Sequence, residues 1–370
     1  MARYKVFVFA EVSNSEMGSA EYHPWLNRFA VFTAGVTLVL IGVGGVVTSK
    51  GVGLAVPDWP TTYGYNMFLF PFSKMVGGVF YEHSHRLVAS TVGLLTAVLA
   101  GWIAWKDRRP WMRKLGWIAF LAVVLQGVLG GLRVVWLKDE IGIVHACLAQ
   151  GFFVLVGAIG LFTTRWWSRF SSRKHPIAGC HALRRLALGT TILIFIQLIL
   201  GASMRHQHAG LSINDFPLAY GRLIPLMDAV SLARINLERI QWMDLPATTA
   251  FQIALQFVHR IAAFLILAGV VWSAWRICKT NGLNPVLRGL SVIWVGLVAA
   301  QIVLGASTIW TNKAADIATA HVVVGSLTLL AGSLLSIILV RCVASREGNP
   351  AWALGIQNSE AEIQKMGMAG

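Results

Sequence analysis

Apolar residues form eight long runs along the chain, and charged or strongly polar residues separate each run from the next. A run of about 20 apolar residues is long enough to cross a lipid bilayer, and in lipid it must be helical to satisfy its own backbone hydrogen bonds. The pattern therefore predicts an all-α integral membrane protein with eight transmembrane helices. We expect these helices over residues 29–48, 84–105, 115–136, 142–163, 183–204, 252–273, 287–309 and 317–340.

The composition supports this class and excludes others. Of the 370 residues, 56% are hydrophobic and only 13% are charged, which is unlike a water-soluble globular domain. The formal net charge is +15, but the lysines and arginines gather in short loops between the apolar runs, so nucleic acid is not an expected partner. The four cysteines form no CxxC motif, which leaves a zinc site or a covalently attached haem without support.

The charge of the loops sets the expected orientation in the bilayer. The loops after the second, fourth and sixth runs are rich in lysine and arginine and should be cytoplasmic. Both termini then lie in the cytoplasm, and the two long loops, 49–83 and 205–251, lie outside. Within the second long loop, residues 222–244 mix apolar and charged positions in a way that predicts an amphipathic helix on the outer surface.

These expectations divide the chain into five segments. They are a cytoplasmic N-terminal segment (1–28), an N-terminal four-helix bundle (29–163), a cytoplasmic linker (164–182), a C-terminal four-helix bundle (183–340) and a cytoplasmic tail (341–370).

An internal repeat relates the two bundles. The segments 53–64 and 210–221 share six of twelve residues at an offset of 157, and further matches follow at offsets of 174 to 176. A near-constant offset predicts two related halves, and because each half has an even number of spans, both enter the membrane in the same sense. Some transporters show such parallel repeats, so the repeat alone does not separate an enzyme from a transporter.

Four histidines lie in these runs or at their ends, close to the expected outer side. They are His85, His145, His259 and His321. A single buried histidine can be a hydrogen-bonded core residue, but ionisable residues inside a membrane are costly, and these four occupy equivalent places in the repeat. Two imidazoles from facing helices can bind a haem iron from both sides. The sequence therefore predicts one haem site at His85 and His145 and another at His259 and His321. One metal ion shared by all four fits less well, because the ligands divide between two bundles.

The residue after the first histidine of each pair is an arginine, Arg86 or Arg260. Either arginine can contact a haem propionate, or it can extend to the membrane interface because it lies near the end of a span.

The halves differ three positions before that histidine, where the first has Glu82 and the second has Gln256. Positions i and i+3 share a helix face, so Glu82 is expected to face the same cavity as His85. A carboxyl group in that cavity can transfer protons. The alternative is that Glu82 is a carboxylate exposed to water at the membrane interface. The difference predicts a reactive first half and a cofactor-holding second half.

Other polar residues carry weaker expectations. His83 is expected to be a loop histidine, because it points away from the His85 face. His206 and His208 form a His-x-His pattern with no evident third metal ligand. The Gln-x-x-Leu-Gly segments that begin at residues 126, 197 and 301 are expected to serve close helix packing.

Taken together, these motifs resemble the haem A synthase family over roughly residues 28–340. The resemblance rests on Glu-x-x-His-Arg at 82–86, His-Arg at 259–260, the histidines 145 and 321, and Gly-Leu-x-x-Pro-Asp-Trp-Pro at 53–60. It implies oxidation of a methyl substituent of haem O to a formyl group through successive hydroxylations, which gives haem A for cytochrome oxidase.

The resemblance also implies roles for individual residues. His85 and His145 would hold the substrate haem, His259 and His321 would ligate the iron of haem b, and Glu82 would be the essential acidic group. It further implies a bacterial plasma membrane location with haem sites toward the outer face. The implied partners are the farnesyltransferase that makes haem O and an electron donor.

One departure from the family matters. Some bacterial members have two cysteines in the first outer loop, where this chain has Val56 and Thr62. A thiol role in that loop is therefore not expected here. Three classes remain open: a haem-oxidising membrane enzyme, a b-type electron-transfer cytochrome, and a transporter or haem-handling assembly factor.

Overall fold

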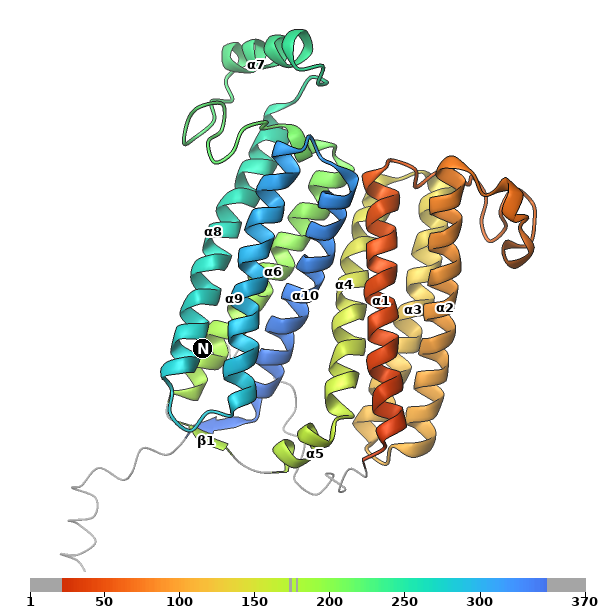
Figure 1. The fold of residues 1–370 in the computed structure, drawn as a ribbon, viewed down its shortest axis with the longest axis vertical. Helices are drawn as coiled ribbons and strands as arrows, with labels where there is room; N and C mark the ends of the chain where they lie inside the picture. Colours follow the sequence, from red (N-terminus) through yellow and green to blue (C-terminus); the bar gives the residue numbers. More distant parts are fainter. Residues whose placement is uncertain (1–21, 173–174, 178, 345–370) are drawn as a thin grey trace, which may run out of the picture.

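Eight helices of the protein are long and apolar enough to cross a membrane, which confirms the expected spans (Figure 1). The computed structural model describes residues 22–172, 175–177 and 179–344. The expected N-terminal segment and tail therefore lie mostly outside the described residues. The spanning helices are α1 (Pro24–Ser49), α2 (Gly77–Lys106), α3 (Pro110–Trp136), α4 (Asp139–Phe162), α6 (Cys180–His206), α8 (Ala250–Lys279), α9 (Pro285–Trp310) and α10 (Ala315–Val340).

The helices extend beyond the apolar runs that predict them. Helices α1, α3 and α9 each have a proline in their first turn, where the missing N–H costs nothing because no partner exists for it. Helix α2 begins at Gly77 rather than near 84. Glu82 and His83 therefore lie on the helix, and both side chains are buried.

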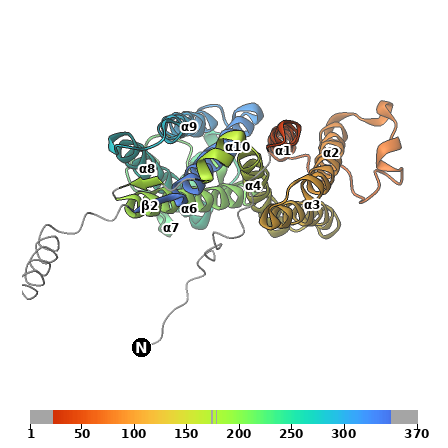
Figure 2. The ribbon, with the colours of Figure 1, turned by 90° about the horizontal axis from the view of Figure 1, so that it is seen from below.

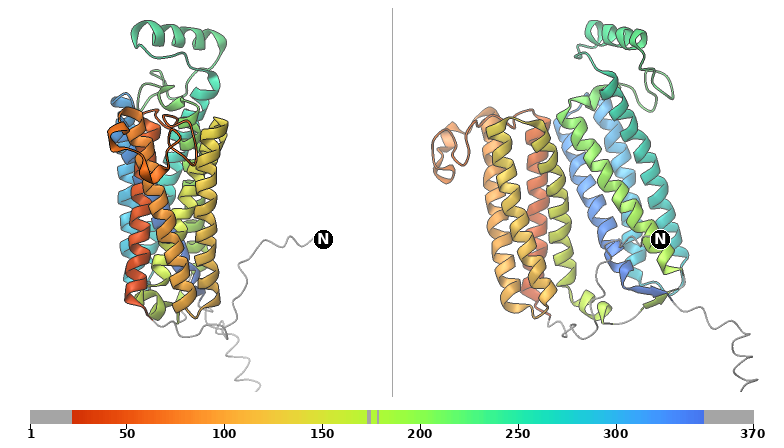
Figure 3. Two further views of the ribbon diagram at one scale, coloured as in Figure 1. Left: turned by 90° about the vertical axis from the view of Figure 1, so that its right-hand side faces the viewer. Right: turned by 180° about the vertical axis from the view of Figure 1, so that it is seen from behind.

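The spanning helices pack in two groups of four. Helices α1 to α4 contact one another as an N-terminal group, and α6, α8, α9 and α10 form a C-terminal group, as Figures 1 and 3 show. Helix α10 also packs against α1 and α4, and the view from below in Figure 2 shows it on the side of the C-terminal group that faces them. Its most apolar stretch is 56% buried, against 22–33% for the other spans, because it has protein on more sides.

Shorter elements lie outside the spans. The first long loop contains the 3-10 turns η1 (Met67–Leu69) and η2 (Phe72–Lys74), and the second contains η3 (Ala209–Leu211) and helix α7 (Ala229–Trp242). At the opposite end lie helix α5 (Arg165–Ser171) and two strands, β1 (His175–Ile177) and β2 (Cys342–Ala344), which pair in parallel. We call the end that carries the two long loops the long-loop end.

Helix α7 is the helix expected within 222–244, although it is shorter than that range. It begins at Ala229 because the side chain of Asp228 accepts a hydrogen bond from the Ser231 amide and caps the first turn. It lies across the long-loop end, beyond the tip of α8 (Figure 1). Val230, Leu237 and Ile240 are exposed on it, while Ile235 is buried.

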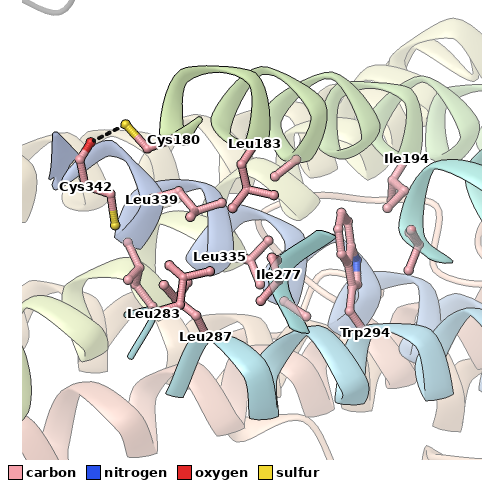
Figure 4. Close-up of a cluster of buried hydrophobic side chains, with 14 of the residues drawn as sticks. Cys180, Leu183, Ile194, Ile277, Leu283, Leu287, Trp294, Leu335, Leu339 and Cys342 are labelled. Carbon is pink, nitrogen blue, oxygen red and sulfur yellow. Dashed lines mark hydrogen bonds between the residues drawn. The ribbon is translucent and has the colours of Figure 1, made fainter. Parts of the chain in front are cut away.

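The C-terminal group has the larger of the two apolar cores, shown in Figure 4. Trp294 is fully buried in it, and its indole N–H donates to the carbonyl of Thr328 on the next helix at 3.0 Å. At the end of this core, the thiol of Cys180 donates to the carbonyl of Cys342 at 3.3 Å, and all four cysteines are free thiols.

Replacement of Gly332 on α10 by alanine should destabilise this core. A β-carbon there would lie 2.6 Å from the Trp294 ring and 2.7 Å from the hydroxyl of Thr191, and both neighbours are held in place. Overpacking of this kind costs about 1–3 kcal/mol, so we expect a lower apparent Tm for the purified protein in detergent. Gly296→Ala on α9 is the matched control, because a β-carbon there meets nothing within 4 Å. Equal stability of the two variants would contradict this packing.

Candidate functional site

The four histidines singled out in the sequence lie at one end of the molecule. His85 on α2, His145 on α4, His259 on α8 and His321 on α10 each lie in the second or third turn of their helix, counted from the long-loop end. All four of these helices begin at that end. Two of the histidines belong to the N-terminal group of helices and two to the C-terminal group.

Each imidazole packs over a glycine of a neighbouring helix. In the N-terminal group, a β-carbon built on Gly44 would lie 2.9 Å from Cε1 of His85, and one on Gly130 would lie 3.5 Å from Cε1 of His145. The absence of a side chain at Gly44 is therefore what lets the His85 ring fit beside α1.

The C-terminal group repeats the same contacts. A β-carbon on Gly201 would lie 3.4 Å from Cε1 of His259, and one on Gly305 would lie 3.3 Å from Cε1 of His321. Gly201 is equivalent to Gly44 in the repeat, because the two positions differ by the same offset of 157 as the repeated loops.

Glutamines hold the backbone next to three of these histidines. The side-chain amide of Gln126 donates to the carbonyl of His145 at 3.1 Å, and that of Gln301 donates to the carbonyl of His321 at 2.6 Å. Gln197 donates to the carbonyl of His259 at 2.8 Å. The Gln-x-x-Leu-Gly segments thus supply both the amide and the glycine that position a histidine, which is more than the packing role expected for them.

The imidazole rings themselves have no partner among the described residues. Nδ1 of each of the four is buried without a hydrogen bond. The rings of His85 and His145 are close enough to interact electrostatically, as are those of His259 and His321. Within the described part of the chain, no group of three or more His, Cys, Asp or Glu residues is placed to hold a metal ion. Each group of helices therefore contains a pair of buried imidazoles whose Nδ1 atoms have no hydrogen-bond partner.

The two repeated loop segments have the same structure. In the first, the carboxylate of Asp58 accepts hydrogen bonds from the amides of Tyr63 and Gly64 at 2.7 and 2.9 Å. In the second, Asp215 accepts from Tyr220 and Gly221 at 2.7 and 2.8 Å.

The tyrosines close both turns in the same way. The hydroxyl of Tyr63 donates to the carbonyl of Ala55, and that of Tyr220 donates to the carbonyl of Ser212. Partial burial alone would raise the pKa of the Asp58 carboxyl, but the hydrogen bonds from Gly64, Thr61 and Tyr63 outweigh it and lower this pKa. Burial raises the pKa of Tyr220 to about 12, so its hydroxyl stays a donor at neutral pH.

Glu82 and Gln256 each fasten one of these loops to a helix. The carboxylate of Glu82 accepts from the amide of Val56 at 2.9 Å and from Arg86 at 2.9 Å, and its side chain is only 5% exposed. Gln256 accepts from the amide of Ile213 and donates to the carbonyl of Gly210 at 3.2 Å. The two side chains make equivalent loop contacts, but only Glu82 carries a charge.

Arg86 and Arg260 bind loop carbonyls in this structure. Both terminal nitrogens of Arg86 donate, to the carbonyls of Val56, Asp58 and Thr61 at 2.7 to 3.0 Å and to Glu82. Arg260 donates to the carbonyls of Ile213, Asp215 and Leu218 at 2.8 to 3.2 Å. Each arginine therefore holds the loop of its own half over the long-loop end of the group.

The expectation that His83 is a loop histidine is wrong. His83 lies on α2 with 1% of its surface exposed, its Nδ1 is 3.1 Å from the hydroxyl of Thr62, and its ring packs on Phe70. It does point away from the His85 face, toward the first long loop. Glu82 and Arg86 interrupt the apolar run after Gly77, so hydropathy does not predict the start of α2.

His206 and His208 do not act together. His206 ends α6, is buried, and its Nδ1 lies 3.5 Å from a carboxylate oxygen of Asp139 on α4. His208 is exposed in the loop that follows. His206 therefore belongs to the contact between the two groups of helices.

Both histidine pairs suit a planar group with a central iron. Each pair offers two neutral imidazoles from different helices of one group, lodged over glycines with no protein partner, and neutral imidazole is a good iron ligand. An unsatisfied buried polar group costs about 1–3 kcal/mol, so a ligand that bound these rings would stabilise the fold. The structure is thus a multi-pass membrane protein with one candidate haem site in each half.

Comparison with known proteins agrees with this class. The family described as cytochrome oxidase assembly protein (COX15-CtaA) matches residues 27–333. A protein named Heme A synthase from Shouchella clausii is 30% identical over 299 residues, covering 79% of this chain and 89% of the relative. Relatives of the same name from Geobacillus kaustophilus and Methylobacterium radiotolerans are 28% and 27% identical, and they cover 78% and 80% of this chain and 83% and 85% of their own length. The chain belongs to the COX15-CtaA family.

Arg86→Gln should loosen the first long loop even when no haem is bound. The substitution removes most of the hydrogen bonds that hold the carbonyls of Val56, Asp58 and Thr61. We expect faster hydrogen–deuterium exchange in peptides from 53–64, measured by mass spectrometry, with 210–221 unchanged. Arg260→Gln is the matched control and should have the opposite pattern. Unchanged exchange in both loops would show that the arginines do not hold them.

Proposed function

We propose that this chain converts haem O to haem A by oxidising a methyl substituent of the porphyrin to a formyl group through successive hydroxylations. The observation that carries the proposal is the asymmetry of two otherwise matched sites: each has a pair of unpartnered imidazoles, but only the first has a buried carboxylate one turn from its first histidine. Relatives that bear the name Heme A synthase, at 25–30% identity, support it.

The proposal divides the two sites by role. His85 and His145 hold the substrate haem, and His259 and His321 ligate the iron of haem b, which would supply one-electron redox chemistry when bound. The glycines beside each ring leave room for it, and the glutamine amides fix the backbone of His145, His259 and His321. These residues would set the position of the iron, and the apolar helices around them would keep water away from it.

Glu82 is the group that we assign to proton transfer in the first site. Each hydroxylation replaces a C–H bond of the methyl group by a C–O bond and needs an oxidant from outside the chain. A buried carboxylate can accept and pass on the protons that this step moves. Gln256 shows that an amide can hold the loop equally well. The contact of Glu82 with the Val56 amide therefore does not require a negative charge, and the charge of Glu82 is paired with Arg86 instead.

A direct contact of Arg86 or Arg260 with a haem propionate stays a prediction, because the guanidinium groups of both arginines bind loop carbonyls here. Through those loops they would cover the two sites, which is a positioning role.

The proposal also sets the protein in its membrane. Two parallel four-helix repeats with cytoplasmic termini would place the long-loop end, and with it both haem sites, toward the outer face of a bacterial plasma membrane. Haem O would come from the farnesyltransferase that makes it, and a separate donor would exchange electrons with the C-terminal site. The positively charged loops between the spans and the bacterial relatives support this orientation.

Two observations favour other functions. Both carboxylate oxygens of Glu82 have protein partners, as a b-type electron-transfer cytochrome would allow. The family description names an assembly protein, which a haem-handling factor would satisfy. The two experiments below separate these alternatives from the enzyme.

Glu82→Gln should abolish haem A formation while both haem sites still fill. The amide can keep the loop contact, as Gln256 does, but it cannot take up a proton near neutral pH. We expect at least a hundredfold lower yield of haem A, in line with the roughly 10²–10⁴-fold contribution of acid–base groups, measured on haems extracted from cells that make haem O. Glu140→Gln, which removes an exposed carboxylate in the first turn of α4, is the matched control and should leave the yield unchanged. Full activity of Glu82→Gln would favour the cytochrome.

His259→Ala should remove the resident haem b, whereas His85→Ala should not. The optical spectrum of the purified protein, before and after reduction, reports the C-terminal site directly. We expect the haem b absorbance to disappear only in His259→Ala. A wild-type protein without any haem absorbance would instead favour an assembly factor or transporter.

A further inference from the structure

Arg133 is a cationic side chain beside the first site that the proposed function does not use. It lies in the last turn of α3, one turn from Gly130, the glycine against which His145 packs. Its guanidinium reaches two other elements at the long-loop end. A β-carbon on Gly142 of α4 would lie 3.0 Å from its Nε, and one on Gly53 of the first long loop would lie 3.1 Å from Nη1.

The position of Arg133 is above the first histidine pair. Gly142 precedes His145 by three residues and therefore lies on the same face of α4, one turn nearer the long-loop end. The positive charge of Arg133 acts on the imidazoles of both His85 and His145. The side chain therefore lies beside the first histidine pair, on its long-loop side.

Arg133 differs from the nearby Arg86 and Arg205 because its guanidinium N–H donors have no acceptor in the described part of the chain. Among the described residues it has no ion pair, and its guanidinium makes no hydrogen bond. The nearby carboxylate of Asp139 pairs with His206 instead. By contrast, the terminal nitrogens of Arg86 are occupied by loop carbonyls, and Arg205 donates to the carbonyl of Gly45 and the hydroxyl of Ser49 at 2.9 Å.

A half-buried, unpaired guanidinium beside a ligand site indicates an anionic ligand. Haem is apolar except for its two carboxylates, and burying those in the apolar part of the group would be costly. They would therefore face the long-loop end, where Arg133 lies. Arginine binds carboxylates through two parallel hydrogen bonds, which suits this task better than lysine.

We propose that Arg133 binds a carboxylate of the substrate haem at the mouth of the N-terminal site. The inference rests on the proposed function only in taking haem as the ligand of His85 and His145. The second half has no counterpart, because the position equivalent at an offset of 175 is Thr308, whose hydroxyl donates to its own helix at Leu304. Arg133 therefore distinguishes the substrate site from the haem b site.

Equilibrium titration with haem O and with its dimethyl ester tests this. The protein is purified with haem b in the C-terminal site, and binding is followed by the change in optical absorbance. Wild type should bind haem O at least about tenfold more tightly than the ester, the factor expected for a hydrogen bond to a charged group. Arg133→Gln should bind haem O as weakly as the ester, with its affinity for the ester unchanged.

Three controls keep the result interpretable. Arg133→Lys should restore part of the preference for the free acid, and an unchanged haem b spectrum would show that the variants are folded. Lys138→Gln removes an exposed charge at the same end of the group and should leave the preference intact. Equal loss in Lys138→Gln, or a wild type that binds acid and ester equally, would overturn the inference. Tight, Arg133-dependent binding of haem O without its oxidation would overturn the proposed function alone.

Discussion

The burial of four imidazoles inside membrane-spanning helices is the constraint on which the rest of this structure depends. A polar ring without a hydrogen-bond partner is costly in a protein interior, yet Nδ1 of each of these rings is buried and unpaired within the described chain. The surrounding residues provide space and a rigid backbone rather than hydrogen bonds to the ring. Gly44 and Gly130, with their counterparts in the second half, provide the space, and glutamine amides fix the backbone. Such an arrangement leaves the ring nitrogens available to a ligand.

The two long loops cover the end of each group of helices above these rings. Each loop satisfies its own backbone through an aspartate, Asp58 or Asp215, and fastens to the helix through an arginine and either Glu82 or Gln256. This explains why the loop segments repeat in sequence more clearly than the helices do. A helix surface facing lipid accepts many apolar residues, whereas a carboxylate that holds two amides cannot be exchanged freely.

How far the sequence predicts this structure depends on the kind of contact. Hydropathy locates all eight spans, because lipid requires long apolar helices, and the repeat locates the four histidines. The start of α2 is not predicted, since Glu82 and His83 are polar and become buried only through loop residues distant in sequence. The partners of Arg86 are also invisible, because backbone carbonyls leave no signature in a sequence. An arginine at the end of a span, such as Arg133, has the same appearance whether it faces water or a ligand.

The contact between the two groups of helices, which we call the seam, brings helix α1 against both His85 and the segment of α10 near His321. On α1, Gly44 accommodates the ring of His85, while its neighbour Gly45 meets Thr319, only two residues from His321 on α10. Arg205 of the C-terminal group binds the carbonyl of Gly45, and Ser49 lies 3.3 Å from the hydroxyl of Thr319. A shift of α1 would therefore disturb a histidine in each half. Because α10 is the most buried span and packs against α1 and α4 as well as its own group, this seam is well placed to keep the sites at a fixed separation. The repeat thus keeps the glycine and glutamine contacts of the histidines alike in the two groups of helices. The charged residues Glu82 and Arg133 are replaced in the second half by the uncharged Gln256 and Thr308.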